Sequence, residues 1–222
     1  HLALLKRICR IAYKEGFSER YHFLHFKIPK QKETTPKALS REDFEKLRDL
    51  EIPEKRRSLV LTRDLFLFAC YAGTAYADTI SITRENLFTD DEGSLWLKYR
   101  RKKNELTARV KLLPEAIALI EKYRDDLRET LFPNQLYSTL RANMKILRVL
   151  AGLTTELVYH MGRRSFASLV TLEEGVPIET ISKMLGHNNI KTTQIYARVT
   201  PKKLFEDMDR FIEATKDLEL VL

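Results

Sequence analysis

A helix that is apolar on nearly all of its faces places the strongest constraint on the fold of this chain. The pattern predicts a helix over about residues 58–71, and its segment 65–70 reads Leu-Phe-Leu-Phe-Ala-Cys. Such a helix has no side suited to water, so we expect it at the centre of a core, with other elements around it. The chain has 222 residues, 44% of them apolar, which is enough for one such core and a smaller appendage.

Amphipathic helices are predicted on either side of this segment. One is expected to start at Ser40, where Asp43 completes a start that resembles a capping box. Pro114 is expected to open another helix, and a third is expected over about residues 134–150, closed by Gly152.

Two alternating segments, 94–100 and 107–113, predict a β-hairpin. The residues that join them, 101–105, read Arg-Lys-Lys-Asn-Glu and give the hairpin a basic tip. The predicted fold class is therefore α+β, mainly helical with a small antiparallel sheet.

The first residues look like an appendage to this core. Residues 2–13 predict one amphipathic helix without partners, and residues 27–37 are polar and marked by prolines, as in a linker. The chain starts at His1, without methionine, and enters helical pattern at once, so we expect a fragment of something longer.

The charge of the chain favours a polyanionic partner. Lysine and arginine total 39 against 31 acidic residues, a net charge of +8, which alone fits DNA and RNA equally. Cys9 and Cys70 stand in apolar surroundings without a Cys-x-x-Cys spacing, so we expect buried reduced thiols and no metal site. No apolar run is long enough for a membrane span and no signal peptide is visible, so a cytoplasmic protein without a membrane partner is expected.

The stretch from His160 to Tyr196 gathers side chains that suit phosphate chemistry. His160 and Arg163 lie three residues apart in a predicted helix, so their side chains emerge from one face. His187 follows in the sequence Leu-Gly-His, and Tyr196 comes nine residues after it. A phosphodiester under attack gains negative charge, which a forked guanidinium and imidazole N–H groups stabilise. Taken singly, such histidines are commonly helix ends or surface residues and such a tyrosine is commonly core, so the prediction depends on the ordered set.

In order and spacing this set resembles the C-terminal signature of the tyrosine recombinases, the phage integrase family, which includes the integrases of conjugative transposons. Arg164 stands where a histidine is common in that signature. The resemblance implies a tyrosine recombinase catalytic domain over residues 39–222. For residues 1–38 it implies the last helix of a core-binding domain and its linker.

The resemblance breaks at one residue. Segment 72–78, Ala-Gly-Thr-Ala-Tyr-Ala-Asp, resembles the turn that carries the family's first catalytic arginine, and Ala75 stands in that arginine's place. Asp78 matches the acid that supports the site, and Lys103 matches the catalytic lysine of the hairpin. Arg101, two residues earlier, is the candidate replacement for the missing arginine; without a replacement the enzyme would be weakened.

The resemblance implies that Tyr196 attacks a DNA phosphodiester, forms a 3′-phosphotyrosine and frees a 5′ hydroxyl, without metal, ATP or other cofactor. Arg163 would clamp the nonbridging oxygens and His187 would add a hydrogen bond. His160 would move the phenol proton, and Lys103 would protonate the leaving oxygen. The side chains expected to contact DNA are Arg100, Lys102, Arg164, Lys183 and Lys191.

The expected partners are double-stranded DNA recombination sites and further copies of the chain, as a tetramer on DNA in the cytoplasm of a bacterium, at the nucleoid. Assembly is expected through the C-terminal helix at 201–216, whose apolar stripe could equally be ordinary core. The stripe consists of Leu204, Phe205, Met208, Phe211 and Ile212.

Two other functions fit parts of the sequence. Residues 178–187 and a helix after them also resemble a helix-turn-helix, so a DNA-binding regulator without catalysis is the alternative. That function leaves His160, Arg163 and the hairpin lysine without a role. A relaxing topoisomerase with the same chemistry is a third possibility.

Overall fold

The computed structural model describes residues 2–27, 38–195 and 201–216. The chain forms two compact units, residues 1–35 and 36–222, which we describe separately. The first contains α1 (Leu2–Lys14), which confirms the predicted helix. Helix α1 buries none of its residues, and Cys9 is only half-buried. The expectation of a buried thiol was wrong there, because no other helix covers α1 within residues 2–27. Most of the predicted linker lies outside the described residues.

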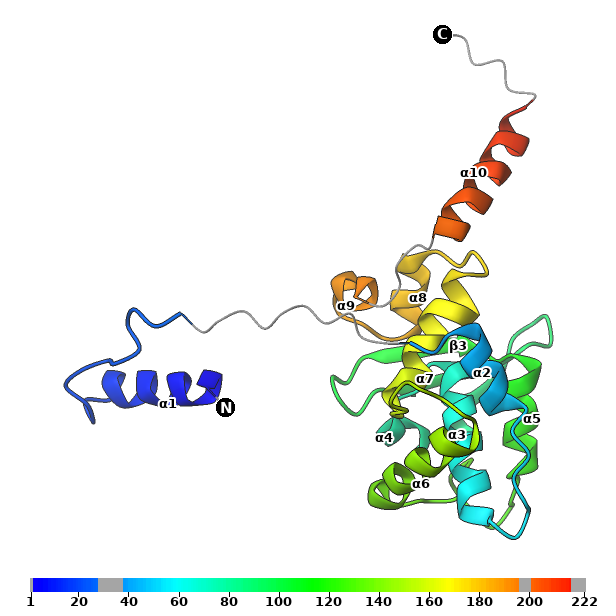
Figure 1. Ribbon diagram of the computed structural model, residues 1–222, viewed down its shortest axis with the longest axis horizontal. Helices are drawn as coiled ribbons and strands as arrows, with labels where there is room; N and C mark the ends of the chain where they lie inside the picture. Colours follow the sequence, from blue (N-terminus) through cyan, green and yellow to red (C-terminus); the bar gives the residue numbers. More distant parts are fainter. Residues whose placement is uncertain (1, 28–37, 196–200, 217–222) are drawn as a thin grey trace. The chain divides into compact units, whose positions relative to one another are not determined.

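Helix α3 (Arg57–Ala72) is the central element of the second unit, as its sequence predicts. Leu65, Phe66 and Phe68 are fully buried, and Cys70 is a buried free thiol. Four helices and a one-turn helix contact α3 around its circumference (Figure 1). They are α2 (Arg41–Arg48), α4 (Tyr76–Thr79), α5 (Pro114–Lys122), α6 (Tyr137–Leu150) and α7 (His160–Ser165).

The helix ends follow local hydrogen bonding. Ser40 caps α2 by accepting a hydrogen bond from the amide of Asp43, and Pro114 is the first residue of α5. Helix α6 starts at Tyr137, three residues later than predicted. The preceding Gln135 is buried and donates to the Ser58 carbonyl at 2.9 Å, which holds this segment extended against α3.

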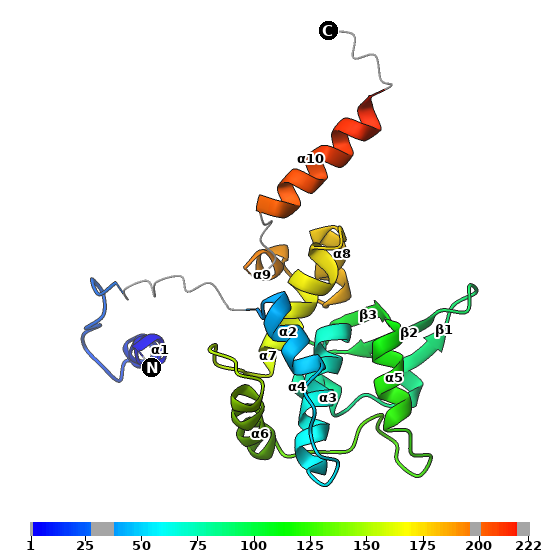
Figure 2. The same cartoon turned by 45° about the vertical axis from the view of Figure 1, so that its right-hand side comes forward.

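The sheet has three antiparallel strands in the order β1-β2-β3: β1 (Leu87–Thr89), β2 (Leu95–Arg100) and β3 (Thr107–Lys111). The predicted hairpin is β2 and β3, with Arg100 opposite Thr107. Strand β1 was missed, because it is three residues long and follows the short 3-10 helix η1 (Arg84–Asn86). Figure 2 shows the sheet beside α3, with α5 across it.

After α7 the chain continues as a π-helical segment, η2 (Phe166–Leu172), then α8 (Ile178–Met184) and α9 (Ile190–Gln194). The sequence predicted helix here but not the wider π geometry. Helix α8 contacts β3, where Val110 packs with Ile181 and Leu185.

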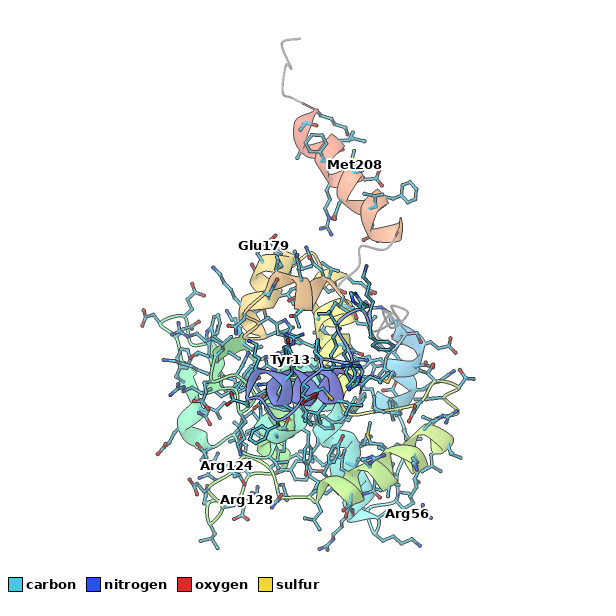
Figure 3. The ribbon with its side chains drawn as sticks, turned by 90° about the vertical axis from the view of Figure 1, so that its left-hand side faces the viewer. Tyr13, Arg56, Arg124, Arg128, Glu179 and Met208 are labelled. Atoms are coloured by element: carbon cyan, nitrogen blue, oxygen red, sulfur yellow. The ribbon has the colours of Figure 1, made fainter. Side chains whose placement is uncertain are left out.

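Helix α10 (Pro201–Thr215) confirms the predicted C-terminal helix. Its apolar side chains are exposed, and Figure 3 shows them standing out from the helix around Met208. In the described part of the chain, no helix is both long enough and apolar enough to cross a membrane.

Gly73, which ends α3, provides a test of this packing. It has a φ of +67°, and a Cβ there would lie 2.7 Å from side-chain atoms of both Leu185 and Phe166. Gly152 ends α6 with a φ of +64° and has nothing within 4 Å of a Cβ. Both alanine substitutions suffer left-handed strain of about 1–2 kcal/mol, but only Gly73→Ala adds a clash of about 1–3 kcal/mol. Urea unfolding should therefore show Gly73→Ala as clearly the less stable; equal losses would contradict the packing described here.

Candidate active site

Arg163 is the centre of the predicted site and is 1% exposed. It lies on α7, the helix that Gly162 brings close to α3: a Cβ on Gly162 would be 3.0 Å from that of Ala69. Its guanidinium donates to the Gly73 carbonyl through Nη1 and to the Leu185 carbonyl through Nη2. These bonds tie the end of α3 to the end of α8 and hold the fork of the guanidinium in one orientation.

His187 lies next to this guanidinium. Gly186, with a φ of +59°, turns the chain after α8, so that the imidazole Nε2 comes to 3.1 Å from Nη2 of Arg163. On the other side of the ring, Nδ1 is 2.8 Å from Oγ1 of Thr193. The imidazole is thus held from both sides, by α7 and by α9.

Arg101 brings a second buried guanidinium to the same turn. It directly follows β2, is 6% exposed, and donates from Nη1 to the Gly186 carbonyl at 2.9 Å. Arg101 and Arg163 therefore bond neighbouring carbonyls of one turn. Within the described residues, Nε of Arg101 is buried without a hydrogen-bond partner, and it lies 3.9 Å from a carboxylate oxygen of Asp78.

Asp78 and Ala75 lie on the helix turn that follows α3. Asp78 is 3% exposed, and its other oxygen accepts the Lys102 amide at 2.9 Å, so the carboxylate holds the hairpin tip in place. Ala75 is the residue before α4, in extended conformation. Its methyl group brings no charge to the site.

Both imidazoles are neutral near pH 7. Burial, followed by the charges of Arg163 and Arg101, lowers the pKa of His187 to about 3. His160 is exposed as a residue, but partial burial of its ring, followed by the charges of Arg164 and Arg163, lowers its pKa to about 4. Lys103 also contributes to both shifts, which puts its charge near both rings.

The remaining predicted site residues lie mostly at the surface or outside the described residues. Lys103 and most of the expected DNA contacts are exposed, while Arg164 is half-buried. The exposed ones are Arg100, Lys102, Lys183 and Lys191. Tyr196, the expected nucleophile, lies outside the described residues, which end on this side at Ile195 just after α9. Across residues 2–27, 38–195 and 201–216, no cluster of His, Cys, Asp or Glu could hold a metal ion.

Sequence reasoning missed two polar side chains of the site. Thr193 contacts His187, and Asn104 donates to the Gly186 carbonyl at 3.3 Å. Thr193 had one available signal, since it lies three residues before Tyr196. Asn104 had none, because the bend of the hairpin tip decides which of its residues turn inward.

Comparison with known proteins shows the family of this chain. The sequence profile of the phage integrase family matches residues 37–203. Tyrosine recombinase XerA of Thermococcus onnurineus is 31% identical over 200 residues, which cover 86% of this chain and 67% of that protein. Tyrosine recombinase XerD of Halalkalibacterium halodurans is 27% identical over 218 residues, with 91% and 71% covered. This chain spans from 64% to 71% of the first curated relatives.

Solved structures show the same fold. A lambda integrase dimer bound to a COC′ core site superposes with a TM-score of 0.70 at 18% identity, covering 88% of this chain and 71% of that one. The XerH recombinase bound to its difH substrate gives a TM-score of 0.59 at 20% identity, covering 80% and 55%.

The fold and the comparisons define a catalytic domain of the tyrosine-recombinase type. This chain belongs to the phage integrase family, whose members are tyrosine-type site-specific recombinases. Nothing favours the regulator without catalysis: α9 has five residues, and its buried Thr193 faces His187.

The lowered pKa values predict how stability depends on pH. Unfolded imidazoles have a pKa of about 6.5, so below that pH the unfolded chain binds more protons than the folded one, and stability falls as the pH falls toward 4. We expect the free energy of unfolding to drop between pH 7 and pH 5.5, and His187→Gln to reduce that drop.

Urea unfolding at several pH values checks this expectation. Asn188→Ala, an exposed neighbour that does not titrate, should keep the wild-type pH dependence. A His187→Gln variant with an undiminished drop would show that the ring does not oppose protonation.

Proposed function

We propose that this chain cuts and rejoins double-stranded DNA at recombination sites through a 3′-phosphotyrosine on Tyr196. The observation that carries the proposal is the pair of buried guanidiniums, Arg163 and Arg101, bonded to neighbouring carbonyls of the 185–186 turn. Two fixed positive forks beside two neutral imidazoles suit a phosphate that gains negative charge. Membership of the phage integrase family supports Tyr196 as the nucleophile.

The reaction follows from these positions. The phenol oxygen of Tyr196 bonds to phosphorus, and the bond from phosphorus to the 5′ oxygen breaks. His160 is neutral in the free protein, so its ring has a lone pair that can accept the phenol proton, and the negative charge of a bound phosphate offsets the cations that lower its pKa. Lys103 delivers a proton to the leaving 5′ oxygen. A 5′ hydroxyl of a partner duplex then reverses these steps, and the phosphoester bond energy is kept throughout.

Arg101 takes the part of the arginine missing at Ala75 in this proposal. Its guanidinium is nearly as buried as that of Arg163, and the charges of both act on His187. Its Nε lies 3.9 Å from the Asp78 carboxylate, an ion pair that keeps the guanidinium at the site. Asp78, which binds the adjacent amide, keeps the hairpin tip at the site.

The DNA backbone would lie along the exposed basic side chains of the hairpin and of the segment from α8 to α9. Arg100, Lys102, Lys183 and Lys191, together with Arg164, would contact phosphates, so binding would weaken steeply with salt. The relatives solved with DNA, XerH with its difH substrate and lambda integrase with a core site, support this part of the proposal.

Assembly into a tetramer on DNA would use α10. Its stripe of Leu204, Phe205, Met208, Phe211 and Ile212 is between 47% and 69% exposed, which suits docking on a neighbouring copy. The protein would act at the bacterial nucleoid, in the cytoplasm.

The nucleophile is tested by Tyr196→Phe. The variant loses only the attacking oxygen, so we expect no covalent DNA adduct on a nicked duplex, while DNA binding stays nearly unchanged. A denaturing gel reads the adduct, and a mobility shift reads binding. An adduct formed by the phenylalanine variant would assign the chemistry to another residue.

The replacement arginine is tested by Arg101→Ala. Losing one fixed donor costs about 2.7 to 4 kcal/mol at a transition state, or roughly a hundred- to thousandfold in rate. We expect Arg101→Ala to slow cleavage about as much as Arg163→Ala, with DNA binding only modestly weaker, and Ala75→Arg to restore part of the rate.

Arg100→Ala is the matched control for that experiment. Arg100 is the neighbouring residue, exposed and paired with Glu105 at 3.3 Å, so its loss should affect binding more than the cleavage rate. Near wild-type cleavage by Arg101→Ala would remove Arg101 from the mechanism.

A further inference from the structure

Thr193 is the buried residue of α9, and its hydroxyl lies against the imidazole of His187. The residue is 0% exposed, whereas its neighbour Thr192 is exposed, so the helix turns only one of two adjacent threonines inward. Oγ1 of Thr193 is 2.8 Å from Nδ1 of His187, within hydrogen-bond distance. The proposed mechanism gives this hydroxyl no part.

The donors and acceptors around the imidazole determine which atom donates in this hydrogen bond. Nε2 of His187 lies 3.1 Å from Nη2 of Arg163. A guanidinium carries only donors, so Nε2 has to accept and therefore carries no proton. The proton of the neutral ring is then on Nδ1, and it is donated to Oγ1 of Thr193. A hydroxyl oxygen has lone pairs to accept it.

We infer that Thr193 is a positioning residue: it accepts Nδ1–H of His187 and, together with Arg163, holds the ring in the tautomer whose Nε2 lone pair is directed at Arg163. The partner of one ring nitrogen decides which nitrogen holds the proton. Thr193 and Arg163 thus hold the imidazole between them. The hydroxyl lies on the helix that leads to Tyr196, so it connects the segment before the nucleophile to the guanidinium that clamps the phosphate.

This tautomer has a consequence for catalysis that rests on the proposed function. In the free protein, Nε2 of His187 is a hydrogen-bond acceptor, whereas a phosphate oxygen needs a hydrogen-bond donor at that position. When a phosphodiester binds, its oxygen takes over the Nη2 donor of Arg163, and Nε2 takes up one proton from solvent to donate to the phosphate. Nδ1–H stays on Thr193 throughout, and the negative charge of the phosphodiester offsets the new positive charge of the ring.

The tautomer can be measured directly in the free protein. Long-range ¹H–¹⁵N NMR spectra of protein labelled at histidine distinguish a protonated Nδ1 from a protonated Nε2, and His187→Gln assigns the signal. We expect the Nδ1–H form for wild type, for Thr193→Ser and for the control Thr192→Val. Thr193→Val leaves Nδ1–H without its acceptor while Arg163 still favours an unprotonated Nε2, so we expect a mixture in which part of the population takes the Nε2–H form.

Cleavage of a nicked duplex then tests the consequence. A lost hydrogen bond of about 1.4 kcal/mol corresponds to about a tenfold lower rate, which we expect for Thr193→Val and not for Thr193→Ser or Thr192→Val. Covalent adduct formation by wild type is measured in the same assay. Its absence would overturn the proposed function but leave the tautomer measurement valid.

The inference fails on either of two results. An Nε2–H ring in wild-type protein would overturn it even if Thr193→Val does not fold. A folded Thr193→Val variant that keeps both the Nδ1–H form and the wild-type rate would show that Thr193 only fills space.

Discussion

The bonds from the buried guanidinium of Arg163 to the carbonyls of Gly73 and Leu185 are the interaction on which the rest of the site depends. A charge that is 1% exposed is costly to bury unless its donors are satisfied, and the two carbonyls come from the ends of different helices. The buried charge is therefore stable only when α3, α7 and α8 pack so that both carbonyls reach the guanidinium. Gly73 and Gly162 permit that packing, because a Cβ at either position would press on its neighbours.

The sequence allowed most of the scaffold to be predicted, because its signals are local. The apolar run of α3, the Ser40 cap, Pro114 at the start of α5 and the alternation of the hairpin all depend on near neighbours along the chain. The errors arose where distant contacts decide. Gln135 delays the start of α6 by bonding to α3. The three-residue strand β1 exists only because β2 lies beside it.

The residues of the site also separate into those that the sequence motif predicts and those whose position is decided by distant contacts. Of the ordered motif, the structure places His160 at the start of α7, and Arg163 on the same helix comes to 3.1 Å from His187. It could not show that Arg101 is buried, because an arginine at a basic hairpin tip usually faces water. The carbonyl of Gly186 and the carboxylate of Asp78, both distant in sequence, make a buried position favourable. Thr193 was missed for the same reason, since its role is set by a ring on another segment.

The alternation of β2 into the hairpin tip exposes Arg100 and buries the next residue, Arg101. Side chains along an extended strand point to opposite faces in turn, so a one-residue shift in register exchanges the two positions. In this chain, a single-residue insertion or deletion in β2 would move a buried charge to the surface, whereas many point substitutions there would not. On the proposal that Arg101 takes the part of the arginine missing at Ala75, lineages that share Ala75 should vary in hairpin sequence far more freely than in hairpin length.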